Sequence, residues 1–142
     1  MDLSVLSAEY ELGPVLMAGE YLKIGGELEM HSIPSYTIDM EGWYGSLSWR
    51  IKDWLSVGAS YGEYYPIGDD KDGDSFVDVG LGDYYAWQKD TTLSVRFDIT
   101  NYWVIKLETH FMNGVALCDR SENPGILDEH WNLYAIKTSL SF

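Results

Sequence analysis

Charged residues of both signs recur at every second position in two stretches of the sequence, and a further lysine lies near its end. Because successive side chains of a β-strand point to opposite faces, charges with this spacing share one face. Rings of such side chains set the ion or solute preference of channels. The same spacing also suits ion pairs that stiffen a sheet, and the residues alone leave both interpretations open. The candidate pore-lining residues are Arg96, Asp98, Lys106, Glu108, His110 and Lys137.

Patterns typical of catalysis or metal binding are weak. Glu108 and His110 would suit an acid/base pair on one strand face, but no nucleophile accompanies them. The sequence has no G-x-S-x-G elbow and no phosphate-binding loop. In the acidic stretch GDDKDGDSFVD, a calcium loop starting at Asp70 would place Ser75 and Leu81 where glycine and glutamate are needed. The sequence therefore predicts neither an enzyme nor a metal or cofactor site.

Length and charge narrow the class of protein. The 142 residues suffice for one ordinary domain, and the formal net charge of -14 argues against a nucleic-acid partner, which needs clustered Lys and Arg. A single cysteine excludes an internal disulfide, and no apolar run reaches the ~18 residues of a transmembrane helix. The aromatic residues include 11 Tyr and 6 Trp, whose rings are favoured where one end is apolar and the other is wet.

Two-residue alternation runs through most of the sequence and predicts an all-β, antiparallel meander of about seven long strands. Tight turns are expected at Gly13-Pro14, Lys52-Asp53 and 100–102, and longer polar loops at His31–Ser35, Pro66–Asp83 and Asp119–His130. Short and long connections thus alternate, as in a transmembrane barrel with short periplasmic turns and longer external loops. The predicted strands are Leu3–Leu12, Val15–Glu29, Tyr36–Ile51, Trp54–Tyr65, Tyr84–Ile99, Trp103–Leu117 and Trp131–Phe142.

Each predicted strand has an apolar and a polar face. Leu93, Val95 and Phe97 lie on one face of the fifth strand, with Ser94 and Arg96 on the other. The apolar face would meet either a soluble core or lipid, and aromatic residues beside the turns favour lipid. The expected membrane-interface aromatics are Trp54, Tyr102, Trp103 and Trp131.

Two stretches resemble Gram-negative outer-membrane porin-like β-barrels. TTLSVRFDITNYWVIKLETHFMNG is similar to the penultimate hairpin of that family, and WNLYAIKTSLSF is similar to its closing strand. The resemblance implies a bacterial outer-membrane channel for passive diffusion of small polar solutes or ions. It also implies that Phe142 is the signal read by the barrel-assembly machinery. The implied partners are outer-membrane lipid, lipopolysaccharide and that machinery, with a homo-oligomer as a further expectation. The matching positions are Arg96, Phe97, Asp98, Asn101, Trp103, Lys106, Glu108 and Gly114.

The predicted barrel has an odd and small number of strands, whereas single-chain bacterial barrels have an even number. The first residues also lack the basic and apolar blocks of a signal peptide. We therefore expect residues 1–142 to be either a single barrel or, as the favoured interpretation, the C-terminal segment of a larger one. The alternatives are a soluble secreted β-sandwich that binds carbohydrate and a structural outer-membrane barrel without a channel.

Overall fold

The computed structural model describes residues 2–30, 33–118, 123 and 125–141, and of these the side chains of 28–30 and 33–36 are excepted. The predicted assembly signal at Phe142 therefore lies outside the described residues. Within them, no helix is long and apolar enough to cross a bilayer.

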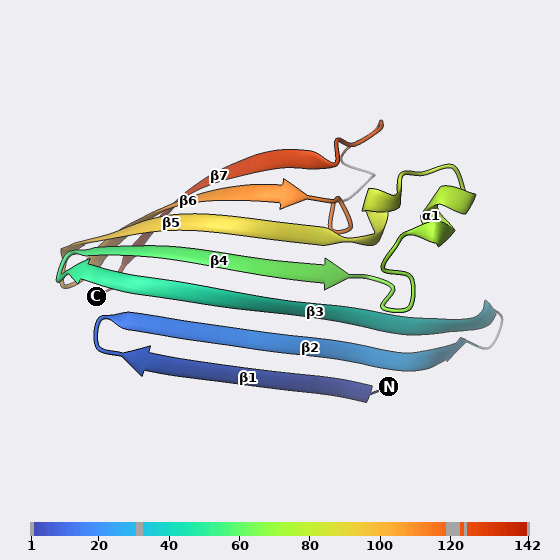
Figure 1. Ribbon diagram of the computed structural model, residues 1–142, viewed down its shortest axis with the longest axis horizontal. Helices are drawn as coiled ribbons and strands as arrows, with labels where there is room; N and C mark the ends of the chain where they lie inside the picture. Colours follow the sequence, from blue (N-terminus) through green and yellow to red (C-terminus); the bar gives the residue numbers. More distant parts are fainter. Residues whose placement is uncertain (1, 31–32, 119–122, 124, 142) are drawn as a thin grey trace.

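Seven strands form one antiparallel sheet in which every strand pairs with its neighbours in sequence (Figure 1). This confirms the predicted all-β meander. Tight turns join the strands at one end of the sheet, called the turn end, and the longer connections lie at the loop end. The strands are β1 (Asp2–Leu12), β2 (Val15–Met30), β3 (Ile33–Lys52), β4 (Leu55–Tyr65), β5 (Gln88–Thr100), β6 (Trp103–Asn113) and β7 (His130–Leu140).

Three predicted boundaries at the loop end are wrong. The expected loop at His31–Ser35 is shorter, because β2 and β3 remain paired as far as Met30 and Ile33 and only two residues separate them. β5 begins at Gln88, because Asp83–Ala86 forms a short 3-10 helix, η1. β6 ends at Asn113 and not at residue 117, because Gly114 has a φ of 90° and leaves the extended conformation. The predicted strict alternation of short and long connections therefore fails at the first loop.

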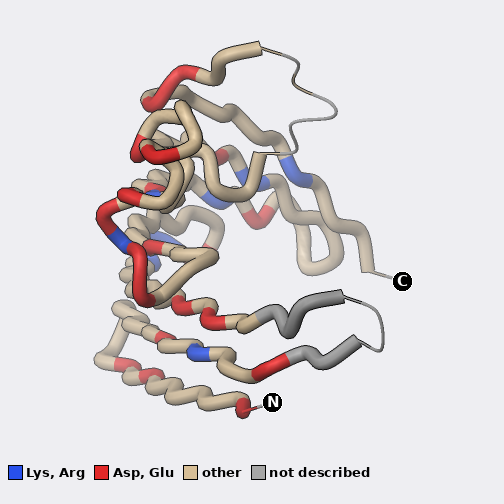
Figure 2. Tube along the Cα trace, turned by 90° about the vertical axis from the view of Figure 1, so that its right-hand side faces the viewer, with Lys and Arg blue, Asp and Glu red and all other residues tan. Residues whose placement is uncertain are grey.

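The sheet is curved but open. Figure 2 shows a trough seen from its loop end, with both ends of the chain on the open side. β1 and β7 are edge strands, and no pairing joins them in the described residues. The predicted closure into a barrel is thus not present in this sheet, although the meander itself is.

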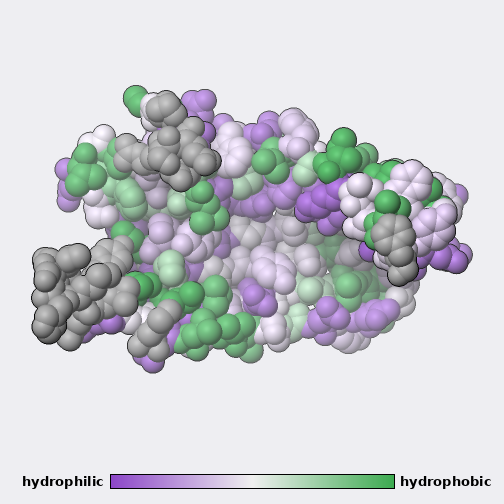
Figure 3. All heavy atoms as spheres, turned by 180° about the vertical axis from the view of Figure 1, so that it is seen from behind, coloured by the Kyte–Doolittle hydropathy of each residue, from purple (hydrophilic) through white to green (hydrophobic). Residues whose placement is uncertain are grey.

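The two faces of the trough differ in composition and in exposure. Leu93 and Ile136 lie on the convex face and are 52% and 79% exposed, whereas Thr92 and Glu108 lie on the concave face and are 7% and 8% exposed. The concave face lines a hollow of about 730 Å³ that reaches from β1 to β6. Figure 3 looks into this hollow from behind, and hydrophilic or near-neutral residues dominate its middle. Over the central strands β4–β6, burial is therefore inverted: the polar face is sheltered and the apolar face is exposed.

A small cluster of loop residues packs at the loop end. Tyr85, Ala86 and Val115 are buried there. The backbone N–H of Val115 donates to the Tyr84 carbonyl oxygen at 3.0 Å, and that of Ala116 donates to the Trp87 carbonyl oxygen at 3.2 Å. These bonds tie the segment before β5 to the segment after β6.

Gly114 allows this close approach, and we expect Gly114→Ala to loosen the cluster. A Cβ at this position would lie 2.1 Å from the Trp87 carbonyl oxygen, so overpacking of ~1–3 kcal/mol adds to the backbone strain of ~1–2 kcal/mol. Gly80→Ala is the matched control, because Gly80 has a similar φ of 83° but no atom within 4 Å of the added Cβ. Hydrogen exchange of the Val115 and Ala116 amides should quicken in the first variant alone; equal exchange in both variants would contradict the steric argument.

Candidate functional site: the concave face

The register of the sheet brings four cations to one level of the concave face. Arg50 pairs with Ser56, which pairs with Arg96 on the next strand. Arg96 then pairs with Lys106, and Lys106 pairs with Lys137. Directly paired residues point to the same side of a sheet, so these side chains form a transverse row over five strands. We call Arg50, Arg96, Lys106 and Lys137 the cationic row.

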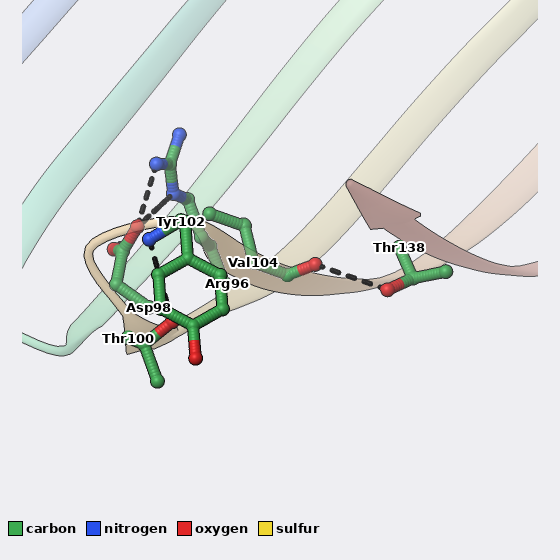
Figure 4. Close-up of polar contacts among 6 residues, drawn as sticks. All are labelled: Arg96, Asp98, Thr100, Tyr102, Val104 and Thr138. Atoms are coloured by element: carbon green, nitrogen blue, oxygen red, sulfur yellow. Dashed lines mark hydrogen bonds and ion pairs between the residues drawn. The ribbon is translucent and has the colours of Figure 1, made fainter. Parts of the chain in front are cut away.

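Two carboxylates offset part of this charge. The Arg96 guanidinium contacts Asp98 at 2.6 Å (Figure 4). Lys106 contacts Glu108 at 2.7 Å, and the ammonium of Lys137 reaches the other oxygen of the same carboxylate. Ion pairs of the kind that the two-residue spacing suits are therefore formed between Arg96 and Asp98 and between Lys106 and Glu108. A role of these residues in lining a pore remains a prediction.

Glu108 is the most enclosed charged side chain of the site. Its side chain is 6% exposed, whereas those of Lys106 and Lys137 are 40% and 63% exposed. It lies two residue pairs nearer the loop end than the cationic row, opposite Ser94 and Ala135 on the neighbouring strands. These small neighbours leave room for both lysine side chains to reach its carboxylate.

His110 does not pair with Glu108. Its Nδ1 lies 2.8 Å from the Asp90 carboxylate and 2.9 Å from Thr92 Oγ1, and the Thr92 hydroxyl donates to Asp90 Oδ1 at 2.9 Å. The carboxylate that contacts His110 is therefore that of Asp90 and not that of Glu108, its neighbour on the same strand face.

Asp90 and Thr92 were not predicted as neighbours of His110. Their two-residue spacing on one strand face was visible in the sequence. Their contact with His110 depends on the pairing of Thr92 with His110 across β5 and β6, which only the register determines.

Three of the predicted interface aromatics lie at the turn end. Trp54 stacks on Phe97 with ring centroids 6.4 Å apart. Tyr102 occupies the β5–β6 turn, where its backbone N–H donates to Thr100 Oγ1 (Figure 4). The indole N–H of Trp103 donates to Thr138 Oγ1 at 2.9 Å.

Trp131 lies elsewhere. It is the second residue of β7, at the loop end, and shares the concave face with Ala135 and Lys137. Its indole N–H donates to the Gly114 carbonyl oxygen at 3.1 Å. Trp131 is therefore part of the loop-end packing in the described residues, and its assignment to a membrane interface remains untested.

A second aromatic group lies on the convex face near the loop end and was not singled out from the sequence. The rings of Trp43 and Tyr61 are 5.6 Å apart. The hydroxyls of Tyr61 and Tyr65 donate to the two oxygens of Glu63, at 2.6 Å and 2.8 Å. The register shows that these side chains share one face, because Trp43 pairs with Glu63 and Gly45 with Tyr61.

Charged residues end the apolar part of the convex face at the same level. Lys23 contacts Asp39 at 3.4 Å, and Lys71 contacts Glu41 at 2.8 Å. With Glu63 these residues form a polar margin between the apolar band and the loops. The convex face is therefore apolar from the turn end up to this margin and ionic beyond it.

The acidic loop has an internal structural role. Asp70 accepts hydrogen bonds from the backbone N–H groups of Asp74 and Ser75, at 2.9 Å and 3.2 Å, and from the Ser75 hydroxyl. The bond from the hydroxyl is the main reason that the pKa of Asp70 is lowered from its ordinary value. These donors belong to or adjoin the short helix α1 (Asp74–Asp78). Across the described part of the chain, no three His, Cys, Asp or Glu residues are grouped to hold a metal ion.

No protein-family model, curated protein or solved structure matches this chain.

Proposed function

We propose that this sheet is part of the wall of a transmembrane β-barrel in a bacterial outer membrane. The barrel would be a porin-like channel for passive diffusion of small polar solutes or ions. The observation that supports this most strongly is the inverted burial, with an exposed apolar convex face and a sheltered polar concave face.

The convex face needs an apolar covering. Monomeric soluble proteins rarely expose contiguous apolar patches of this kind. In a soluble sandwich a second sheet covers the apolar face, but the described strands all belong to one sheet. Lipid is the covering that requires no second layer. An exposed apolar face on a single sheet disfavours a soluble carbohydrate-binding module.

Strand length and the position of the margin agree with a bilayer. Each strand has at least 11 residues, and β3 has 20. A tilted transmembrane strand needs about 9–11 residues, whereas soluble strands most often have about 5–6. The polar margin and the neighbouring Trp43 and Tyr61 rings lie where one membrane interface would then fall. Trp54, Tyr102 and Trp103 mark the other interface at the turn end.

The concave face is suited to water and polar solutes. Ser46, Ser48, Ser60 and Ser94 line the hollow together with charged residues. Small hydroxyl side chains leave space, and charges on the wall select among solutes that fit. Outer-membrane lipid, lipopolysaccharide and the barrel-assembly machinery are the partners of such a protein, and assembly into a homo-oligomer is compatible with it.

The direction of the edge strands limits how the trough can close. β1 and β7 both run from the loop end to the turn end. Five strands lie between them, and the direction reverses from each strand to the next, so the first and the seventh strands point the same way. A closing segment that pairs antiparallel with both edges therefore contains an odd number of strands. The complete barrel then has an even number, as is usual in bacterial outer-membrane barrels.

Two neighbouring cysteines test the lipid assignment. In a Cys118→Ser background, which removes the single native cysteine, Leu93→Cys and Ser94→Cys place thiols on opposite faces of β5. After refolding into lipid vesicles, a membrane-impermeant maleimide should label the Ser94→Cys variant and spare the Leu93→Cys variant. Equal labelling of both, or a wild-type protein that is monomeric and folded without detergent, would refute the membrane proposal.

Conductance tests the channel separately. Wild-type protein in planar bilayers should give discrete current steps that carry ions through the hollow. Lipid protection at position 93 without any conductance would refute the channel and favour a structural barrel.

A further inference from the structure

The cationic row is unusual in so acidic a protein. The whole chain has a net charge of -14, yet four cations lie at one level of the concave face. Strand spacings of ~4.8 Å make the row about 19 Å wide over its four steps. Like charges in directly opposite positions are destabilising, and Arg96–Lys106 and Lys106–Lys137 are such pairs. The row therefore requires compensating negative charge.

The protein supplies only part of that charge. Asp98 compensates Arg96, and the single carboxylate of Glu108 is shared by Lys106 and Lys137. Among the described residues no carboxylate contacts Arg50 within salt-bridge distance. The two carboxylates that contact the row therefore offset two of its four positive charges. Glu11 lies at the level of Glu108, but on β1, across the hollow.

Arg50 is held in place and is open to the hollow. Its backbone N–H donates to the Pro14 carbonyl oxygen at 2.8 Å, which anchors the end of β3 against the β1–β2 turn. Its side chain is exposed, and with Arg96 and Lys106 it lines the hollow of about 730 Å³. The hydroxyl groups of Ser48 and Ser56 line the same space and can donate hydrogen bonds to a ligand.

We propose that the cationic row binds an anionic group, phosphate or carboxylate, on a small solute that enters the hollow. A guanidinium presents a planar fork of donors that matches both groups, and the neighbouring lysines add positive charge. This inference deepens the proposed channel by naming the class of solute, and it rests on that proposal for the route by which the solute arrives.

Acidic residues on the other side of the hollow shape the site. Glu9 and Glu11 on β1 also line it, and no ion pair involves either in the described structure. Their charge repels an anion from β1 and confines it to the β3–β6 side of the hollow. It also weakens binding overall, as a channel requires, because a solute that binds too tightly does not leave.

The test measures anion binding without reference to conductance. Wild-type protein refolded in detergent micelles is titrated with inorganic phosphate and, separately, with acetate at constant ionic strength. Phosphate binding is followed by the 31P linewidth. Acetate binding is followed by the decrease in that linewidth as acetate displaces phosphate. Saturable binding of either anion is expected, and the tighter one identifies the preferred group. The absence of saturable binding by both would overturn the proposal.

Two charge-matched variants locate the site. Arg50→Gln should weaken binding about tenfold, equivalent to ~1.4 kcal/mol, because it removes the one cation of the row that forms no salt bridge in the described residues. Lys23→Gln removes the same charge from the convex face, where Lys23 contacts Asp39, and should leave the affinity unchanged. Equal affinities of these two variants would overturn the assignment. If Arg50→Gln does not fold, Arg50→Lys replaces it and should bind less tightly than wild type, since an ammonium lacks the bidentate fork; wild-type affinity in Arg50→Lys would count against the site.

The outcome separates this inference from the channel. Phosphate binding that is lost in Arg50→Gln, in a protein without conductance, would refute the channel and retain the anion site. Conductance with no saturable anion binding would refute the anion site and retain the channel.

Discussion

Leu93→Arg is expected to lower the free energy of unfolding in lipid by about 2–4 kcal/mol, the cost of an arginine on the lipid face near the bilayer midplane. Leu93 lies in the middle of β5, on the convex face, and is 52% exposed. On a soluble protein the same change at so exposed a position would alter stability by about 0.5 kcal/mol or less. Urea unfolding of protein refolded into lipid vesicles, followed by tryptophan fluorescence, measures the difference.

Ile99→Arg is the control for depth. Ile99 lies on the same face of the same strand and is 48% exposed, but it is one residue from the end of β5 at the turn end. Near an interface an arginine costs only about 0–1 kcal/mol. Equal costs at positions 93 and 99 would contradict a bilayer that is centred on the convex face.

Glu108→Gln should destabilise the protein by about 1–3 kcal/mol through loss of a charge shared by two lysines. Removing one partner of a fully buried pair costs about 3–5 kcal/mol, but Lys106 and Lys137 are substantially exposed, so solvent screening reduces this value. The loss leaves Lys106 opposite both Arg96 and Lys137, with Asp98 as the remaining acid beside the row. The free energy of unfolding in micelles, at low and at high salt, is the measurement, and salt should reduce the effect.

Asp98→Asn makes the same charge change in a more open pair and serves as the control. The side chains of Arg96 and Asp98 are 47% and 21% exposed. An exposed ion pair contributes about 0.2–1 kcal/mol, so this variant should lose less stability than Glu108→Gln. A larger loss in Asp98→Asn would show that Glu108 is not the central acid of the concave face.

Much of the strand architecture follows from local sequence. Alternation of Leu93, Ser94, Val95 and Arg96 determines which side chains share a face of β5, because the period of a strand is two residues wherever it lies. The same reasoning placed the tight turns at Gly13-Pro14 and at residues 100–102. It failed at Asp83–Ala86 and at the short β2–β3 connection, where hydrogen bonding between distant segments decides whether the chain stays extended.

The candidate site divides in the same way. The sequence by itself determined that Arg96 and Asp98 share one face of β5, and that Lys106 and Glu108 share one face of β6. Only the tertiary structure decided that Arg50 and Lys137 lie in one transverse row with Arg96 and Lys106, and that His110 contacts Asp90. Cross-strand neighbours depend on the sum of all hairpin registers, and a slip of one residue in any of them would turn a strand's charges to the other face. Closure is likewise a tertiary property, because it depends on what pairs with β1 and β7, and alternation within a strand carries no information about its partner.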